Sequence, residues 1–158
     1  MTTYEQKKQL YRQYVAELTG ITGRRIGSPK DADRWCDEYI AADYAKWINI
    51  WNADGTQLIG FLIICKPPAC PEAADRLIDQ AYVLPEYRRM GLMRKTVAEY
   101  VKNHKGIYSL LVYGQNTAAL KAWDRIFSGL RFQKTAPEYS AKFAKDDLEL
   151  IFYVPEKP

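Results

Sequence analysis

The sequence has little that points to a metal centre, a disulfide framework or a membrane anchor. Its 158 residues include one histidine and three cysteines, Cys36, Cys65 and Cys70, which lack the paired spacing of a metal site. We therefore expect free thiols in a reducing compartment, the cytoplasm, and no bound metal. The longest apolar run, Leu58 to Cys65, is far shorter than the ~20 residues that cross a bilayer. The polar segment 2–9 does not resemble a signal peptide.

The composition is that of an ordinary globular protein, without internal repeats or low-complexity segments. Hydrophobic residues make up 47% and charged residues 27% of the chain, and a chain of this length can bury a core of its own. We expect one domain over residues 1–158. The net charge of +4 suits a small anionic ligand as well as it suits nucleic acid, so it does not separate these two partners.

Hydrophobic periodicity and turn residues indicate alternating helices and strands. The order is two helices, three strands, a helix, a strand, a helix and final strands, which predicts an α/β (α+β) fold with helices on both faces of a mixed sheet. Residues 139–147 are expected to form a polar connection or a long hairpin arm. The expected helices are 4–18, one starting near Ser28 or Asp31, 92–104 and 116–127; the expected strands are 45–52, 57–64, 77–83, 107–113, 132–135 and 148–154.

The stretch from Leu77 to His104 organises the rest of the chain. It reads as a strand, a basic turn with one glycine, and an amphipathic helix. The first N–H groups of a helix have no intrahelical partner and lie at its positive end, where they bind anions. Gly91 allows a ligand close to the backbone, and Arg88 and Arg89 add positive charge. The stretch predicts a phosphate site; the alternative is a solvated helix start.

The residue order in this turn resembles the acetyl-CoA-binding motif of the GNAT N-acetyltransferase superfamily, Arg/Gln-x-x-Gly-x-Gly/Ala. Arg88 and Gly91 fill the first two fixed places, and Met93 stands at the third. A methionine is tolerated there if its side chain points into the core. The resemblance extends to the order of elements through nearly the whole chain, and it implies a mostly antiparallel, twisted sheet.

A second motif resembles the same superfamily, in the pattern Asn-x-x-Ala-x-x-x-Tyr after a strand. Asn116 and Ala119 match, and Trp123 replaces the tyrosine. The resemblance implies that Asn116 contacts the pantetheine arm or orders the turn; a helix-cap role is compatible with either. An indole N–H cannot supply a proton as a phenol can. Trp123 is therefore expected to pack in the core or against the cofactor, or to donate a hydrogen bond to sulfur.

The resemblance also implies which residues hold acetyl-CoA. The strand end would pair with pantetheine through free main-chain groups, one N–H would polarise the thioester carbonyl, and the basic turn would hold the pyrophosphate. The implied cofactor-binding residues are Ala81, Tyr82, Val83, Arg88, Arg89, Met90, Gly91, Leu92, Met93, Arg94 and Asn116.

The implied catalytic residues are Asp79, Tyr113 and Trp123. Some superfamily members carry an acidic residue at the place of Asp79, where it would serve as the base; the alternative is an ion-paired or surface carboxylate. Strict alternation would put Asp79 on the same sheet face as Ala81. Tyr113 and Tyr139 are both candidates for the acid that protonates the thiolate.

The implied function is acetyl-CoA-dependent N-acetylation of a primary amine, on a small molecule or peptide, by direct attack. One alternative is a non-catalytic CoA-binding regulator, motivated by Trp123 and Met93. A nucleic-acid-binding module, motivated by pairs of arginines, ranks last because no recognised motif is present. By resemblance, the first two helices shape the acceptor site. The acidic residues within 31–43 would attract a cationic amine or form a solvated helix face. The acceptor and the oligomeric state stay open, a homodimer included.

Overall fold

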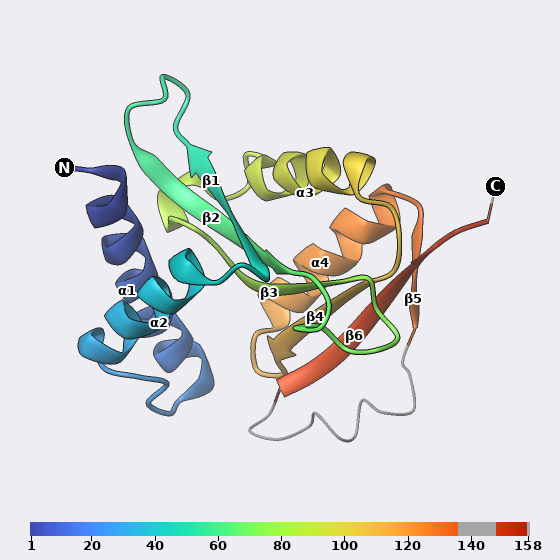
Figure 1. The fold of residues 1–158 in the computed structure, drawn as a ribbon, viewed down its shortest axis with the longest axis horizontal. Helices are drawn as coiled ribbons and strands as arrows, with labels where there is room; N and C mark the ends of the chain where they lie inside the picture. The colour runs from blue at the N-terminus through green and yellow to red at the C-terminus, as the bar shows by residue number, and fades with distance from the viewer. Residues whose placement is uncertain (136–147, 158) are drawn as a thin grey trace.

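The computed structural model describes residues 1–135 and 148–157 and shows helices on both sides of a central sheet (Figure 1). The predicted order of elements is confirmed, and the predicted strand at 132–135 is present. The expected connection at 139–147, with Tyr139, lies outside the described residues. The elements are α1 (Thr3–Thr22), α2 (Pro29–Ala41), β1 (Ala45–Trp51), β2 (Leu58–Cys65), β3 (Arg76–Val83), the short 3₁₀ helix η1 (Pro85–Tyr87), α3 (Leu92–Asn103), β4 (Tyr108–Tyr113), α4 (Thr117–Gly129), β5 (Phe132–Thr135) and β6 (Leu148–Pro155).

The six-stranded sheet has the order β1-β2-β3-β4-β6-β5 and is antiparallel except between β3 and β4. The parallel register of β3 and β4 covers only Arg76–Ile78 against Tyr108–Leu110. Beyond these residues β3 continues beside β2, and β4 continues beside β6. Because each strand follows a different half of a twisting sheet, the two strands separate in the middle of the sheet.

Two buried clusters cover the two faces of the sheet. One joins α3 and α4 to the sheet through Val97 and Phe127, and the other joins α1 and α2 through Leu10 and Cys36. All eight residues of β2 are buried, because both faces of this strand are covered. The predicted mixed sheet with helices on both faces is confirmed.

The two N-terminal helices begin at capping boxes. Thr2 and Glu5 cap α1, and Ser28 and Asp31 cap α2, so both residues considered for the start of the second helix take part. The helical spacing of the two segments predicts that Tyr4 and Ile40 face inward, but these side chains are 50% and 38% exposed. The Tyr4 hydroxyl instead donates to Asp37 across the outer surface of the helix pair. Ile40 lies in the last turn of α2.

Among the described residues, no helix combines the length and apolar character required to cross a membrane. The three cysteines are free, with Cys36 and Cys65 buried. Within the same residues no group of histidine, cysteine or acidic side chains is arranged to hold a metal ion.

Candidate active site

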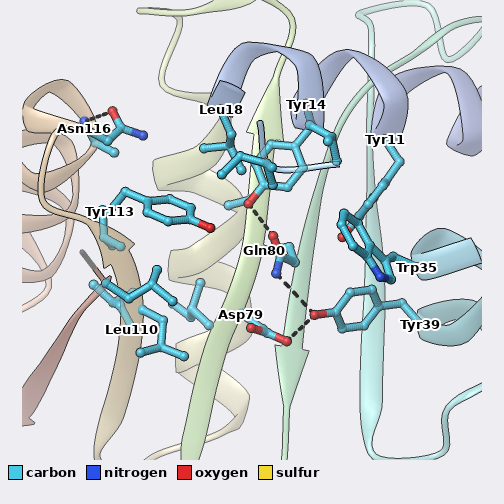
Figure 2. Close-up of a pocket in the computed structure, with 18 of the residues that line it drawn as sticks. Tyr11, Tyr14, Leu18, Trp35, Tyr39, Asp79, Gln80, Leu110, Tyr113 and Asn116 are labelled. Atoms are coloured by element: carbon cyan, nitrogen blue, oxygen red, sulfur yellow. Dashed lines mark hydrogen bonds between the residues drawn. The ribbon is translucent and has the colours of Figure 1, made fainter. Parts of the chain in front are cut away.

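A cavity of about 460 Å³ lies where β3 and β4 separate (Figure 2). Its wall includes Tyr14 of α1 and Tyr39 of α2 from one face of the sheet, and Ala119 and Trp123 of α4 from the other. The cavity therefore passes through the sheet between its two halves. Residues of α4 thus border the cavity on one face of the sheet, and residues of α1 and α2 border it on the other.

The edge of β3 that faces this cavity carries main-chain groups that β2 does not use. The Leu84 N–H donates to the Ile59 carbonyl oxygen of β2 at 2.9 Å. Because main-chain groups alternate in direction along an antiparallel pair, the groups of Tyr82 also point to β2, and those of Ala81 and Val83 point to the open edge. The Val83 carbonyl accepts from Arg88 Nε at 2.9 Å, which fits this direction. An extended ligand can add to this edge as a strand does.

The turn after β3 presents main-chain N–H groups at the start of α3. Gly91 is the N-cap with φ of 74°, and Arg89 is also left-handed, with φ of 67°. The first hydrogen bond of the helix runs from Lys95 N to the Gly91 carbonyl at 3.0 Å. The N–H groups of residues 92–94 therefore have no acceptor within the helix and lie at its positive end, as an anion site requires.

The Arg88 side chain is already bonded to other residues of the protein. Its N–H donates to the Pro85 carbonyl at 3.2 Å, and its guanidinium pairs with Glu17 of α1 at 2.6 Å, in addition to its bond with Val83. Arg88 thus fixes the turn to α1 and to the end of β3. The main-chain donors available to a phosphate begin after it, at Arg89.

Met93 packs against both buried clusters, as expected for a methionine at a place where glycine or alanine is usual. Met90, by contrast, is 65% exposed.

Asp79 lies at a β-bulge, which corrects one expectation. Ile63 of β2 pairs with Gln80 and Ile64 pairs with Ile78, so Asp79 is an extra residue in β3. Strict alternation fails here: Ala81 packs with the cluster under α3 and α4, whereas Asp79 bonds to Tyr39 of α2. Asp79 and Ala81 therefore face opposite sides of the sheet, and the carboxylate points to the α1/α2 side.

A hydrogen-bond network surrounds the Asp79 carboxylate (Figure 2). The Tyr39 hydroxyl donates to Asp79 Oδ2 at 2.5 Å and accepts from Gln80 Nε2 at 3.2 Å. The Tyr14 hydroxyl donates to Gln80 Oε1, and the Cys65 thiol lies 3.8 Å from Asp79 Oδ2. Burial raises the pKa of Asp79, and the hydrogen bonds from Tyr39 and Cys65 lower it in part. The carboxyl is thus poised to take up a proton.

The remaining site residues line the β4 side of the cavity. The Tyr113 hydroxyl points into the cavity towards β3 in Figure 2, and the Arg24 guanidinium lies 5.4 Å from its ring centre. Asn116 caps α4 by accepting from Ala119 N at 3.2 Å, and it also lines the cavity, so its two roles are compatible. Trp123 is 8% exposed and borders the cavity from the core.

Three residues of the site were missed from the sequence: Tyr14, Tyr39 and Gln80. The helical spacing of α2 predicts that Tyr39 faces inward together with Trp35, and this inward face was the available signal for a pocket residue. Gln80 had no local signal, because its partners Tyr14 and Tyr39 are 66 and 41 residues away in the sequence.

The fold and the site define a protein with a split sheet and a helix N-terminus, an arrangement that suits an extended anionic ligand. A sequence model of the acetyltransferase (GNAT) family matches residues 9–128. The chain belongs to this family, and it is an N-acetyltransferase. No curated protein sequence matches the chain significantly.

Solved structures of acetyltransferases share the fold. An acetyltransferase from Thermus thermophilus is 17% identical, with a TM-score of 0.67 over 97% of this chain and 92% of that one. Diaminobutyrate acetyltransferase from Paenibacillus lautus, in complex with L-2,4-diaminobutyric acid and coenzyme A, is 20% identical, with a TM-score of 0.62 over 96% and 89%. An aminoglycoside N-acetyltransferase in complex with CoA is 17% identical, with a TM-score of 0.58 over 78% and 79%. The predicted acetyl-CoA cosubstrate agrees with the CoA bound in two of these structures.

Proposed function

We propose that this protein transfers an acetyl group from acetyl-CoA directly to a primary amine inside the split between β3 and β4. The observation that carries the proposal is the cavity that passes through the sheet. It runs from the open edge of β3 at Ala81, beside Asn116 at the start of α4, to the Asp79 carboxylate on the opposite face. The N-terminus of α3 follows the same strand at Gly91, outside the cavity itself.

The turn and the strand edge would hold acetyl-CoA. Main-chain N–H groups from Arg89 to Arg94 fit the diphosphate, since they lie at the positive end of α3. The main-chain groups of Ala81 and Val83 fit the amides of the pantetheine arm. An N–H at the same edge would donate to the thioester oxygen as negative charge develops on it.

Asp79 would act as the general base on the acceptor side. It takes a proton from the arriving ammonium group, and the neutral nitrogen then attacks the thioester carbon. The C–N bond forms and the C–S bond breaks. Tyr113 would supply the proton that the leaving thiolate gains, and the nitrogen loses one proton to solvent as the amide forms. Trp123 would pack beside the cofactor without donating a proton.

A pair of glycine variants tests this function with a matched control. Gly91 and Gly55 both have positive φ, 74° and 72°, and a Cβ meets nothing within 4 Å at either position. Gly91→Glu and Gly55→Glu therefore carry the same backbone strain, but only the first puts a negative charge at the proposed diphosphate site. We expect Gly91→Glu to lose the heat of acetyl-CoA binding and the release of free CoA with amines, and Gly55→Glu to keep both. Equal behaviour of the two variants would refute the proposed cofactor site.

We also propose that the reaction takes place in the cytoplasm. The three free cysteines are consistent with a reducing compartment.

A further inference from the structure

The acceptor half of the cavity is lined by aromatic rings. The rings of Tyr14, Tyr11 and Tyr39 follow one another, with centroids 5.6 and 6.2 Å apart, and Trp35 and Tyr44 extend the same wall. Within residues 1–135 and 148–157, no lysine, arginine or histidine lines the cavity. The Arg24 guanidinium lies 5.4 Å from the ring centre of Tyr113, on the β4 side, and does not line the cavity. On the α1/α2 wall an acceptor that carries its own carboxylate would meet no described positive side chain and would approach the negative charge of Asp79.

The hydroxyls of Tyr14 and Tyr39 and the side-chain amide of Gln80 are already paired on this wall. The Tyr14 hydroxyl is used by Gln80, the Tyr39 hydroxyl is used by both Asp79 and Gln80, and the Gln80 amide is used at both ends. An acceptor with many hydroxyl groups, such as a sugar, could form hydrogen bonds with these side chains only by breaking the bonds that they make with one another. Beside these paired groups the wall presents the aromatic faces of Tyr11, Tyr14 and Tyr39, which favour a flat apolar body.

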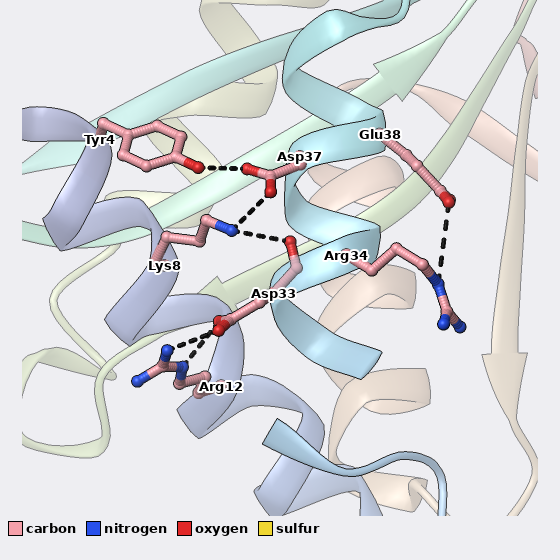
Figure 3. Close-up of polar contacts among 7 residues, drawn as sticks. All are labelled: Tyr4, Lys8, Arg12, Asp33, Arg34, Asp37 and Glu38. Carbon is pink, nitrogen blue, oxygen red and sulfur yellow. Dashed lines mark hydrogen bonds and ion pairs between the residues drawn. The ribbon is translucent and has the colours of Figure 1, made fainter. Parts of the chain in front are cut away.

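The positions of the two carboxylates on the cavity wall favour an acceptor with one amine over an acceptor with two. Asp79 is partly buried in the interior of the cavity and marks the place of the reacting nitrogen. Glu38 is the second carboxylate on the wall, but its side chain is 64% exposed and lies 3.9 Å from Arg34 (Figure 3). A second ammonium group would therefore gain little at Glu38, because exposed ion pairs contribute weakly.

The other acidic residues of α2 do not reach the cavity. Asp33 pairs with Arg12 at 2.5 Å, and Asp37 pairs with Lys8 at 2.7 Å, across the outer surface of α1 and α2 (Figure 3). These ion pairs hold the two helices together. The acidic residues within 31–43 were expected either to attract a cationic amine or to form a solvated helix face. Asp33 and Asp37 lie on the helix surface, and of this acidic stretch only Glu38 borders the cavity.

We propose that the acceptor is a primary monoamine on a short alkyl arm of an aromatic or similarly flat apolar body that bears no carboxylate. This inference rests on the proposed function and adds the substrate class. The cavity volume of about 460 Å³ lies within the ~300–1,000 Å³ typical of small-molecule sites.

A matched panel of amines tests the substrate class through the rate of CoA release. The panel contains 2-phenylethylamine, phenylalanine, n-butylamine, putrescine and the aminoglycoside neamine. We expect 2-phenylethylamine to have the highest kcat/KM and phenylalanine, which differs only by its carboxylate, to be slower by about 100-fold or more. A higher kcat/KM for phenylalanine, putrescine or neamine would overturn the substrate class and leave the transferase in place. Acetyl-CoA binding without acetylation of any amine in the panel would overturn the substrate class too; no binding and no acetylation would overturn both proposals.

Two tryptophan variants test the wall itself. Trp35 and Trp51 both pack against the same buried cluster, but only Trp35 lines the cavity. We expect Trp35→Ala to raise KM for 2-phenylethylamine about tenfold more than for n-butylamine, and Trp51→Ala to change both alike. If Trp35→Ala does not fold, Gly27→Ala replaces it, since a Cβ at Gly27 would lie 2.6 Å from Cη2 of the Trp35 ring and must displace it. Equal effects on the two amines would contradict the inference.

Discussion

The hydroxyl of Tyr39 offers the sharpest test of how the base is tuned. Tyr39→Phe removes the O–H that donates to Asp79 Oδ2 at 2.5 Å and leaves the ring in the aromatic wall. The hydrogen bond stabilises the charged form of the carboxylate, so its loss raises the pKa of Asp79 beyond the increase that burial already causes. Because Tyr39 acts through Asp79, it is a positioning residue.

The size of the effect follows from the kind of hydrogen bond. A hydrogen bond to a charged group contributes about 1.5–3 kcal/mol, and each ~1.4 kcal/mol corresponds to a factor of ten. A general base must be deprotonated, so the rate rises with pH through the pKa of the carboxyl. In Tyr39→Phe this rise moves to higher pH. At a pH on the acid limb the variant should be about 10- to 100-fold slower, and at alkaline pH it should approach the wild-type rate.

The assay is the pH profile of kcat/KM, measured from CoA release at saturating acetyl-CoA. Tyr108→Phe is the matched control, because its buried hydroxyl donates to the His104 carbonyl and does not line the cavity. We expect the control profile to keep the wild-type midpoint. A Tyr39→Phe profile that is lowered equally at every pH, without a displaced midpoint, would refute this account of the base.

Three further predictions concern stability and the acid. Between the ordinary pKa of an aspartate and the raised pKa of folded Asp79, the folded state binds the proton more tightly, so the free energy of unfolding falls as pH rises. Asp79→Asn removes the titrating carboxyl, so its free energy of unfolding, measured by urea titration, should not show this fall. The variant should therefore gain stability relative to the wild type as pH rises. A difference in the free energy of unfolding that is the same at every pH would contradict the buried charge. Gly91→Ala should cost about 1–2 kcal/mol because its φ is 74°, and thermal unfolding at an unchanged midpoint would argue against the left-handed cap. Tyr113→Phe should lower kcat by about 10²-fold or more with little change in KM; an unchanged kcat would remove Tyr113 as the acid.

The fold was largely predictable because its signals are local. Period-two and helical patterns located the strands and helices, and Asp54-Gly55 marked the first hairpin. The strand–turn–helix that we propose for the diphosphate was predictable for the same reason, since a strand, Gly91 and an amphipathic helix follow one another directly. The structure added that Arg88 is engaged by Glu17, which lies 71 residues earlier in the chain.

The acceptor side was not predictable because it depends on contacts between distant residues. Tyr14 and Gln80 are 66 residues apart, and Tyr39 and Asp79 are 40 residues apart. The bulge that turns Asp79 towards α2 arises from its pairing with β2, and no residue pattern in β3 predicts it. Alternation therefore gave the wrong face for Asp79, the carboxylate that we propose as the base.

The most direct test of the central claim is a crystal structure of the protein with coenzyme A. The account predicts the diphosphate on the main-chain N–H groups of residues 89–94. It also predicts the pantetheine arm along Ala81 to Val83, with the sulfur in the opening between β3 and β4. Coenzyme A bound on another face, or β3 and β4 paired along their whole length, would contradict it.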